Sequence, residues 1–225
     1  MRRRTVTLAL LFLVAACAAP HPSRPPQPAD TSGFLDDYSD LRPGGPGEVA
    51  MVYRNPEARW RSYQKVLLEP VTLWRSGKHS LDAVPEGDLL RLIADLEDAV
   101  RQRLGTAFTM VDEPGAGVMR IRLAITSARA EDPILDVMRS HGDAELTSGE
   151  GPLNAETRRF VEGAKIEGEI RDAVTEQLLA AGVEHRRREG ALPIDTWAEL
   201  DRALGFWADR LCMRLEARTN EGKAR

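Results

Sequence analysis

Hydrophobic side chains recur at every second position in several segments of the chain, which is the period of a half-buried β-strand. Segment 118–127 alternates most regularly, with its apolar residues on one face. Segments 164–171 and 178–187 follow the same pattern, with charged residues between many of the apolar ones. Segment 65–73 is also apolar, but Pro70 predicts an edge, a bulge or a break there, because proline lacks the N–H that a strand donates.

Turn residues between these segments predict two hairpins. A turn rich in glycine at 112–117 joins the short segment 107–111 to the strand 118–127. A second turn at 172–176 joins the last two strands. We therefore expect each turn to connect strands that pair with one another.

Two longer segments have the hydrophobic period of amphipathic helices. The first extends over 89–104, where Pro85 suits the first turn and a glycine follows the end. The second extends from Trp197 to about Ala217. Thr196 and Glu199 have the spacing of a capping box, which marks the beginning of a helix.

This order of elements predicts an α+β domain. Strands with one polar face imply an antiparallel sheet of about five strands, with both helices on its apolar face. We expect the irregular segment 34–53 to lie over the domain as a strap. A chain of this size buries one core, so we expect a single domain over 33–217 and a disordered tail over 218–225.

The N-terminal residues have the pattern of a bacterial lipoprotein signal peptide. Three arginines at 2–4 precede an apolar run that ends at Cys17 and is too short to span a bilayer. The sequence Val14-Ala15-Ala16-Cys17 resembles a lipobox. We expect residues 1–16 to be removed and Cys17 to carry the lipid. Residues 17–32 are rich in proline and predict an extended, flexible tether.

The lipid on Cys17 determines where the protein is expected to be. In the lipoprotein class that this pattern indicates, the cysteine carries diacylglycerol and an amide-linked fatty acid such as palmitate, and several acyl chains make a stable anchor. Gram-negative sorting commonly reads an aspartate after the cysteine as an inner-membrane retention signal, and alanine stands there instead. We therefore expect an outer-membrane anchor, with the domain facing the periplasm.

Charge and cysteine content limit the partners. The net charge is −4, and removal of the three arginines within residues 1–16 changes it to −7. A negative chain does not favour nucleic acid as a partner, and it leaves membrane binding to the lipid. An acylated Cys17 cannot form a disulfide with Cys212, the other cysteine. We expect Cys212 to be a buried, inert thiol, with pairing between chains as the alternative.

Several short motifs together resemble one family. They are Ser32–Tyr38, Lys65–Val71, Val111–Val118, Val161–Ala164, Glu167–Asp172 and the positions Trp197, Leu204, Phe206, Trp207, Ala208 and Leu211. In this combination the chain resembles a family of proteobacterial lipoproteins known as domain of unknown function 3313, over most of 32–215. The turn at 175–177 departs from the family because it lacks a glycine. The resemblance implies an envelope lipoprotein and carries no catalytic residues.

Patterns for metal binding and nucleophilic catalysis are weak. The four histidines are isolated from one another and from cysteine: His21, His79, His141 and His185. We therefore expect no metal and no cofactor. Segment 140–143 contains the residue types of a catalytic triad, but sequence neighbours do not form the geometry of a triad.

A pair of carboxylates is the strongest catalytic alternative. Glu167 and Glu169 lie on one strand face, about 6 to 7 Å apart, and glycosidases use two carboxylates about 5 to 9 Å apart. Lys165 and Arg171 flank them on the same face. We therefore expect a solvent-exposed row of salt bridges, paired across strands with the basic face of 118–127.

The long connection 129–157 is the main candidate for a binding surface, because such connections are either functional or loose. Four of its apolar residues cluster on one face of a predicted short helix: Ile134, Leu135, Val137 and Met138. The helix is expected either to cover the sheet or its edge, or to dock a partner through exposed apolar side chains.

These observations predict a non-enzymatic binding or accessory module of the cell envelope, with another envelope protein or a glycan as its partner. One alternative is a cell-wall glycan hydrolase that uses Glu167 or Glu169. Another is a carrier of an apolar ligand between sheet and helices. A cleft around the carboxylates would favour the hydrolase, and a large apolar pocket would favour the carrier.

Overall fold

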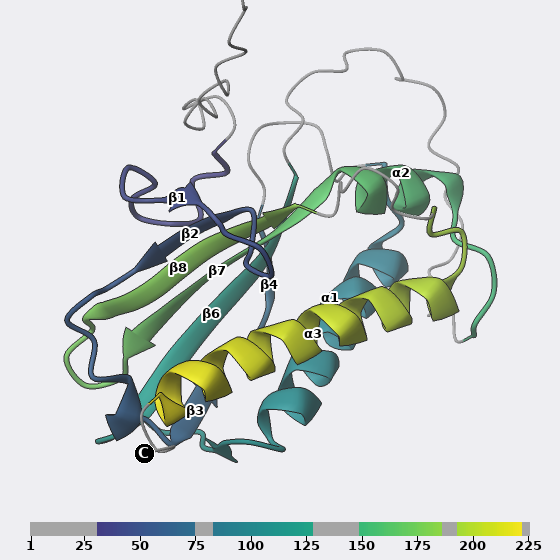
Figure 1. Cartoon of the computed structure of the whole chain (residues 1–225). Coiled ribbons are helices and arrows are strands. Elements are labelled where there is room, and N and C mark those ends of the chain that lie inside the picture. Colours follow the sequence, from purple (N-terminus) through teal and green to yellow (C-terminus); the bar gives the residue numbers. More distant parts are fainter. Residues whose placement is uncertain (1–30, 75–82, 128–148, 186–192, 222–225) are drawn as a thin grey trace, which may run out of the picture.

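A computed structural model describes residues 31–74, 83–127, 149–185 and 193–221. The described elements are, in chain order, β1 (Arg42–Pro43), β2 (Met51–Arg54), the 3-10 helix η2 (Trp60–Ser62), β3 (Lys65–Leu68), β4 (Thr72–Trp74), α1 (Glu86–Leu104), β5 (Thr109–Met110), β6 (Val118–Ser127), α2 (Ala155–Gly163), β7 (Ala164–Asp172), β8 (Leu178–His185) and α3 (Trp197–Asn220). They form an α+β domain, as predicted, in which α1 and α3 lie on the same side of the sheet (Figure 1).

The sheet is mixed rather than antiparallel, and its described part has eight strands instead of about five. The order is β1-β2-β8-β7-β6-β3-β5, and β4 also pairs with β6. All pairs from β1 to β6 along this order are antiparallel, whereas β3 and β4 run parallel to β6. Helix α1 returns the chain to the same end of the sheet, as parallel neighbours require. A hydrophobic period carries no information about strand direction. The sequence pattern therefore did not predict the parallel pairing of β3 and β4 with β6.

The predicted hairpin of 107–111 with 118–127 is wrong. Strand β5 pairs with β3, which lies between β5 and β6. The amide of Thr109 donates to the carbonyl of Gln64 at 3.1 Å, and that of Val111 donates to the carbonyl of Val66 at 2.9 Å. Strand β6 has β7 on one side and β3 with β4 on the other, so no edge of β6 remains for β5. The second predicted hairpin, of β7 with β8, is confirmed.

Pro70 breaks the predicted strand 65–73, as expected. The two pieces, β3 and β4, both pair with β6. Beyond the break, the amide of Val71 donates to Oε2 of Glu97 on α1 at 3.2 Å. A helix side chain thus replaces the partner that the ladder does not supply.

The long helices form where the hydrophobic period predicts them. In α1, Leu96 and Val100 are completely buried against the sheet and α3. Helix α3 begins with the predicted capping box of Thr196 and Glu199 and continues to Asn220, beyond the expected end near Ala217. The short helix α2 was not predicted from the sequence, because its nine residues carry too few apolar positions to show a period.

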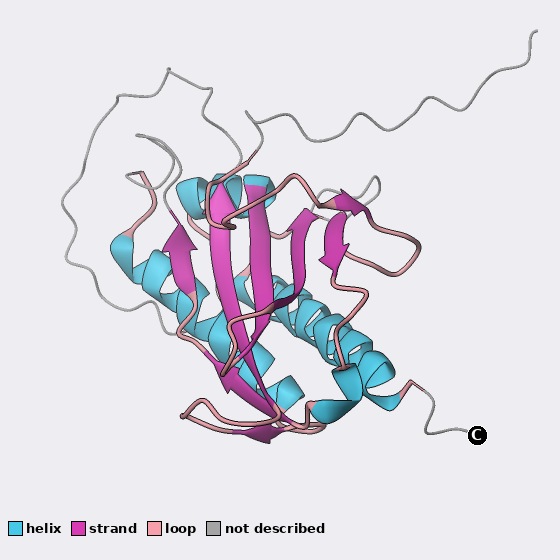
Figure 2. Ribbon diagram, turned by 90° about the vertical axis from the view of Figure 1, so that its left-hand side faces the viewer, coloured by secondary structure: helices cyan, strands magenta, loops and turns pink. Residues whose placement is uncertain are grey.

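The predicted strap 34–53 is only partly present, because its second half contributes β1 and β2 to the sheet. Residues 32–41 do lie over the sheet, and we call them the strap below. The strap covers the face of the sheet that is opposite to the helices. Figure 2 shows the sheet with the helices behind it. Phe34, Leu35 and Leu41 are buried there against Ala124 of β6 and Val183 of β8. The sheet therefore has a large core under the helices and a smaller one under the strap.

Candidate functional site

Both candidate carboxylates, Glu167 and Glu169, lie on β7 under the strap. Glu167 is 1 % exposed and Glu169 is 2 % exposed, so the expected solvent-exposed row is wrong. Phe34 and Leu35 of the strap close over this face of the sheet and exclude water from it. Buried charges need hydrogen-bond partners, and both side chains have them.

Glu167 accepts hydrogen bonds from two neutral hydroxyl groups. Tyr38 of the strap donates to Oε2 at 2.6 Å, and Thr126 of β6 donates to Oε1 at 2.9 Å. Burial raises the pKa of Tyr38, and the hydrogen bond to Glu167 raises it further. Tyr38 therefore stays protonated at neutral pH and ties the strap to the sheet.

Glu169 binds two arginines. Its Oε1 is 2.5 Å from Nη1 of Arg122, and its Oε2 is 2.9 Å from Nη2 of Arg171. Burial by itself would raise the pKa of Glu169, but the hydrogen bonds and charges of Arg171 and Arg122 outweigh burial and hold the pKa below its ordinary value. Arg171 also binds Asp36 of the strap at 2.8 Å. The predicted pairing with the basic face of 118–127 is thus confirmed for Arg122.

All four oxygens of the two carboxylates accept hydrogen bonds from the protein. A glycosidase needs one carboxyl group that reaches the leaving oxygen and one that reaches the sugar or a water. Here the strap covers both groups. Its Tyr38 donates to Glu167 directly, and its Asp36 pairs with Arg171, which in turn binds Glu169. The arrangement fixes the strap to the sheet, which is a structural role.

A polar cleft opens elsewhere on the domain, and we call it by that name below. Its volume is about 430 Å³, within the roughly 300 to 1,000 Å³ that is usual for small-ligand sites. Three segments line it, at η2, after α1 and at the end of α3: Arg61, Tyr63, Gln64, Gly105, Thr106, Ala107, Phe108, Thr109, Glu216, Thr219 and Asn220.

The polar cleft is lined mainly by neutral hydrogen-bonding groups. Gln64 and Asn220 are exposed and contribute amide groups, and exposed Thr109 contributes a hydroxyl group. The hydroxyl of Thr106 donates to the carbonyl of Arg103 at 2.7 Å and is left to act as an acceptor. Such groups donate and accept hydrogen bonds without a charge. Glu216 is the one carboxylate among the described lining residues, whereas glycoside hydrolysis uses two.

Two side chains of the polar cleft are held by the surrounding structure. The hydroxyl of Tyr63 donates to Oδ2 of Asp172 at 2.8 Å. Burial and this contact with Asp172 raise the pKa of Tyr63 to about 12, so the tyrosine is neutral at physiological pH. Arg61 donates to the backbone carbonyl of Glu221 after α3. One wall of the cleft is therefore preformed.

A second pocket, the apolar pocket, lies between the sheet and α3. Its volume is about 70 Å³, which is below the range of ordinary ligand sites. Most of its walls are aliphatic or aromatic: Val49, Val52, Ile121, Leu123, Ile166, Ile170, Trp207, Leu211 and Leu215. The Nε1 donor of Trp207 is buried, and among the described residues it has no acceptor. In this closed arrangement the pocket is too small for the large ligand that a carrier binds.

The other predicted site residues are only partly within the described chain. Ile134, Leu135, Val137 and Met138 lie outside it, as do Cys17 and three of the four histidines. His185 ends β8. Within the described ranges, no group of three or more histidine, cysteine or acidic residues is placed to hold a metal ion. The same ranges contain no helix that is both long and apolar enough to cross a membrane.

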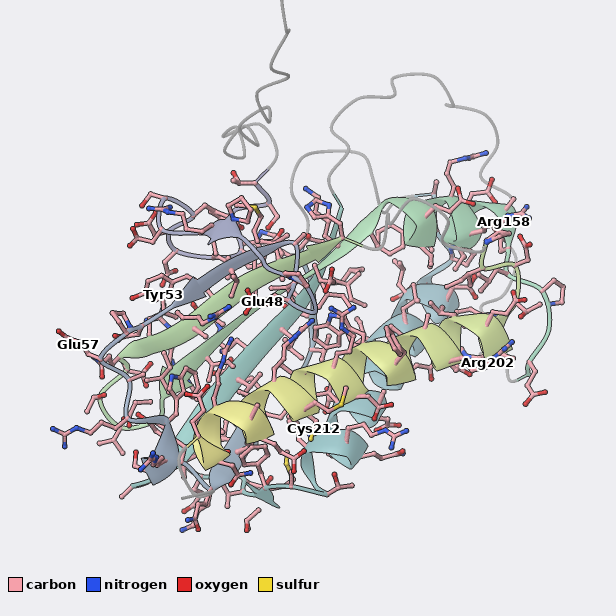
Figure 3. All side chains as sticks on the ribbon, viewed as in Figure 1. Glu48, Tyr53, Glu57, Arg158, Arg202 and Cys212 are labelled. Atoms are coloured by element: carbon pink, nitrogen blue, oxygen red, sulfur yellow. The ribbon has the colours of Figure 1, made fainter. Side chains whose placement is uncertain are left out.

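Cys212 is buried on α3, as expected, on the side that faces α1 (Figure 3). Its Sγ donates to the carbonyl of Arg103 at 3.3 Å. Burial raises the pKa of the thiol, and the charge of Glu216 raises it further. A raised pKa keeps the thiol protonated and unreactive.

The fold is an α+β domain, in which a mixed sheet carries two long helices on one face and the strap on the other. A comparison with family models shows which family this domain belongs to. The model of a protein of unknown function (DUF3313) matches residues 30–211, so the chain belongs to this family. The resemblance drawn from the sequence motifs is thereby confirmed at the level of the family. Comparisons with curated proteins and with solved structures give no match.

The polar cleft was not anticipated from the sequence. Its lining comes from segments about 40 and 110 residues apart, at Arg61–Gln64, 105–109 and 216–220, and pattern analysis does not bring such segments together. Neutral threonine, asparagine and glutamine side chains also give no motif. The one local signal is the glycine that ends α1, since the chain turns there into the cleft wall.

Proposed function

We propose that this chain is an outer-membrane lipoprotein, anchored by lipid on Cys17 and facing the periplasm, whose domain binds a glycan of the cell envelope without hydrolysing it. The polar cleft is the observation that carries the binding role. Its volume suits a small ligand or one end of a larger one. The lipobox at 14–17 supports the anchor.

The chemistry of the polar cleft favours a saccharide. A glycan presents many neutral hydroxyl and amide groups, and the exposed amides and hydroxyls of the cleft match them as donors and acceptors. Hydrolysis is less well supported, because the cleft has one lining carboxylate and because Glu167 and Glu169 are buried under the strap. A binding role needs neither a second carboxylate nor a movement of the strap.

Co-sedimentation with purified peptidoglycan sacculi tests this proposal. The full-length lipoprotein should sediment with the sacculi. Gln64→Ala combined with Asn220→Ala should weaken the binding about 30-fold, because it removes two hydrogen-bonding side chains worth about 1 kcal/mol each. The control is Gln102→Ala combined with Gln177→Ala, which removes two exposed amides outside the cleft.

Three results would contradict the proposal. In the first, the unmodified protein stays in the supernatant. In the second, the cleft variant and the control variant lose the same affinity, so that the cleft is not the binding site. In the third, the protein releases soluble fragments from the sacculi and loses this activity in Glu167→Gln, which would support the hydrolase.

A further inference from the structure

The apolar pocket is closed by one particular segment, the loop 44–50 between β1 and β2. Val49 of this loop lies directly over Gly182 of β8, where a Cβ atom would be 2.9 Å from Cγ2 of Val49. Gly182 pairs with Gly168 of β7 on the helix-facing side of the sheet. Two glycines and Ala180 thus leave a space under α3 that the loop side chain covers.

Arginines of α3 hold the loop in this closed position. Arg210 donates to the carbonyl of Glu48 at 3.1 Å, and Arg214 donates to the carbonyl of Gly47 at 2.7 Å through Nη2. The loop itself is rich in glycine, and Gly47 has a positive φ of 82°. Such a loop changes conformation at little cost. The closed position therefore depends on a few polar contacts at the loop and on the packing of Val49.

Two arginines, Arg214 and Arg218, line the apolar pocket toward the C-terminal end of α3. The lining also contains two glutamates, but both pair with arginines outside it: Glu48 with Arg54, and Glu169 with Arg122 and Arg171. Arg218 is half-buried and lies over the ring of Trp60 at 5.3 Å. Burial lowers the pKa of Arg218, and the neighbouring charge of Arg54 lowers it further. An anion at this end would stabilise the charged form of Arg218.

We propose that the apolar pocket binds a fatty acid, with the aliphatic chain between the sheet and α3 and the carboxylate at Arg218, after the loop 44–50 has moved aside. Trp207 and Arg218 are eleven positions apart on α3, which corresponds to about 16 Å of helix and suits a medium-length chain. The closed volume of about 70 Å³ is about half that of an apolar cavity that takes up benzene. Entry of a fatty acid therefore requires the loop to open. This site is separate from the polar cleft.

Tryptophan fluorescence tests the site, since Trp207 lies in the pocket wall and bromine quenches indole emission on contact. The full-length lipoprotein, in phosphatidylcholine nanodiscs, is titrated with terminally brominated undecanoic acid. We expect saturable quenching that disappears in Trp207→Phe. Ala180→Leu, which fills the pocket, should abolish it while the far-ultraviolet circular dichroism stays unchanged.

Three arginine variants separate the roles of head group and loop. Arg218→Gln should weaken binding of the acid about tenfold, as loss of a charge-assisted hydrogen bond predicts, and should leave binding of the uncharged brominated undecanol unchanged. Arg210→Gln removes a bond to the loop but does not line the pocket, so it should tighten binding about fivefold. Arg202→Gln is the control, because Arg202 lies nearer the N-terminal end of α3 (Figure 3) and donates to the carbonyl of Ala198.

Other outcomes would overturn the assignment. Quenching that persists in both Trp207→Phe and Ala180→Leu places the probe elsewhere. Equal binding of the acid and the alcohol removes the role of Arg218. If nanodiscs of brominated phosphatidylcholine quench Trp207 without added acid, the occupant is a bilayer phospholipid and the fatty acid is wrong.

Discussion

Replacing Glu169 by glutamine removes the negative charge that Arg122 and Arg171 share under the strap. Glutamine keeps the shape of the side chain, but its NH₂ group turns a donor toward arginine donors. A hydrogen bond to a charged group contributes about 1.5 to 3 kcal/mol. The two arginines are 30 % and 18 % exposed, and Glu69 and Asp36 also bind them, so water and other carboxylates recover part of the loss. We expect Glu169→Gln to lower the free energy of unfolding by about 2 kcal/mol.

Thermal and urea denaturation of the purified protein measure this loss. For a domain of this size, about 2 kcal/mol lowers Tm by roughly 4 to 8 °C. The matched control is Glu176→Gln. Glu176 also pairs with an arginine, Arg120, but its side chain is 51 % exposed, and an exposed pair contributes about 1 kcal/mol or less.

The pH dependence of the same variant checks the cause. The pKa of Glu169 is lowered in the folded state, so its stabilisation is present above the unfolded value of about 4.3 and is lost as the pH falls through the folded value. The difference between the unmodified protein and Glu169→Gln should therefore shrink below about pH 4. A difference under 0.5 kcal/mol at pH 7, by the threshold for ordinary surface changes, or one that grows on acidification, would refute the reasoning.

Two further predictions concern the core and the segment 129–157. Leu96→Asp places an unpaired carboxylate at a position with no exposure; it should cost several kcal/mol, so that little folded protein is recovered, and an unchanged Tm would contradict the packing of α1. Ile134→Ser combined with Met138→Ser should remove about 1 to 3 kcal/mol of apolar contact per side chain wherever these residues pack. Loss of in-cell crosslinking from this segment at an unchanged Tm would support docking of an envelope protein, and a lower Tm would show that the segment covers the domain's own core.

The local features of the fold were predictable because their causes are local. The capping box of Thr196 and Glu199 and the break at Pro70 follow from hydrogen-bonding groups within a few residues. The direction of β3 relative to β6 depends on where α1 returns the chain, which the hydrophobic period does not contain. The partner of β5 depends in the same way on which strand edges remain open.

The surroundings of Glu167 and Glu169 were likewise predictable only where their causes are local. The charged neighbours correctly predicted ion pairs for Glu169, which binds Arg122 and Arg171, whereas Glu167 accepts from the hydroxyl groups of Tyr38 and Thr126. The predicted exposure of both glutamates was wrong because Tyr38, about 130 residues away in sequence, brings the strap over them. A strand face that carries charged residues is predicted to be solvent-exposed. It is buried only if another segment supplies hydrogen-bond partners, and the sequence pattern does not show which distant segment does so.

The anchor on Cys17 is the part of the proposed function that one measurement tests most directly. Cells that express the full-length chain, Cys17→Ser or Cys212→Ser are labelled with an alkyne analogue of palmitate and fractionated after a high-salt wash. We predict that the unmodified chain and Cys212→Ser carry the label and stay in the outer-membrane fraction, whereas Cys17→Ser carries none and is released as a folded domain. A Cys17→Ser chain that keeps the label, or that stays in the pellet after the wash, would contradict the lipid anchor.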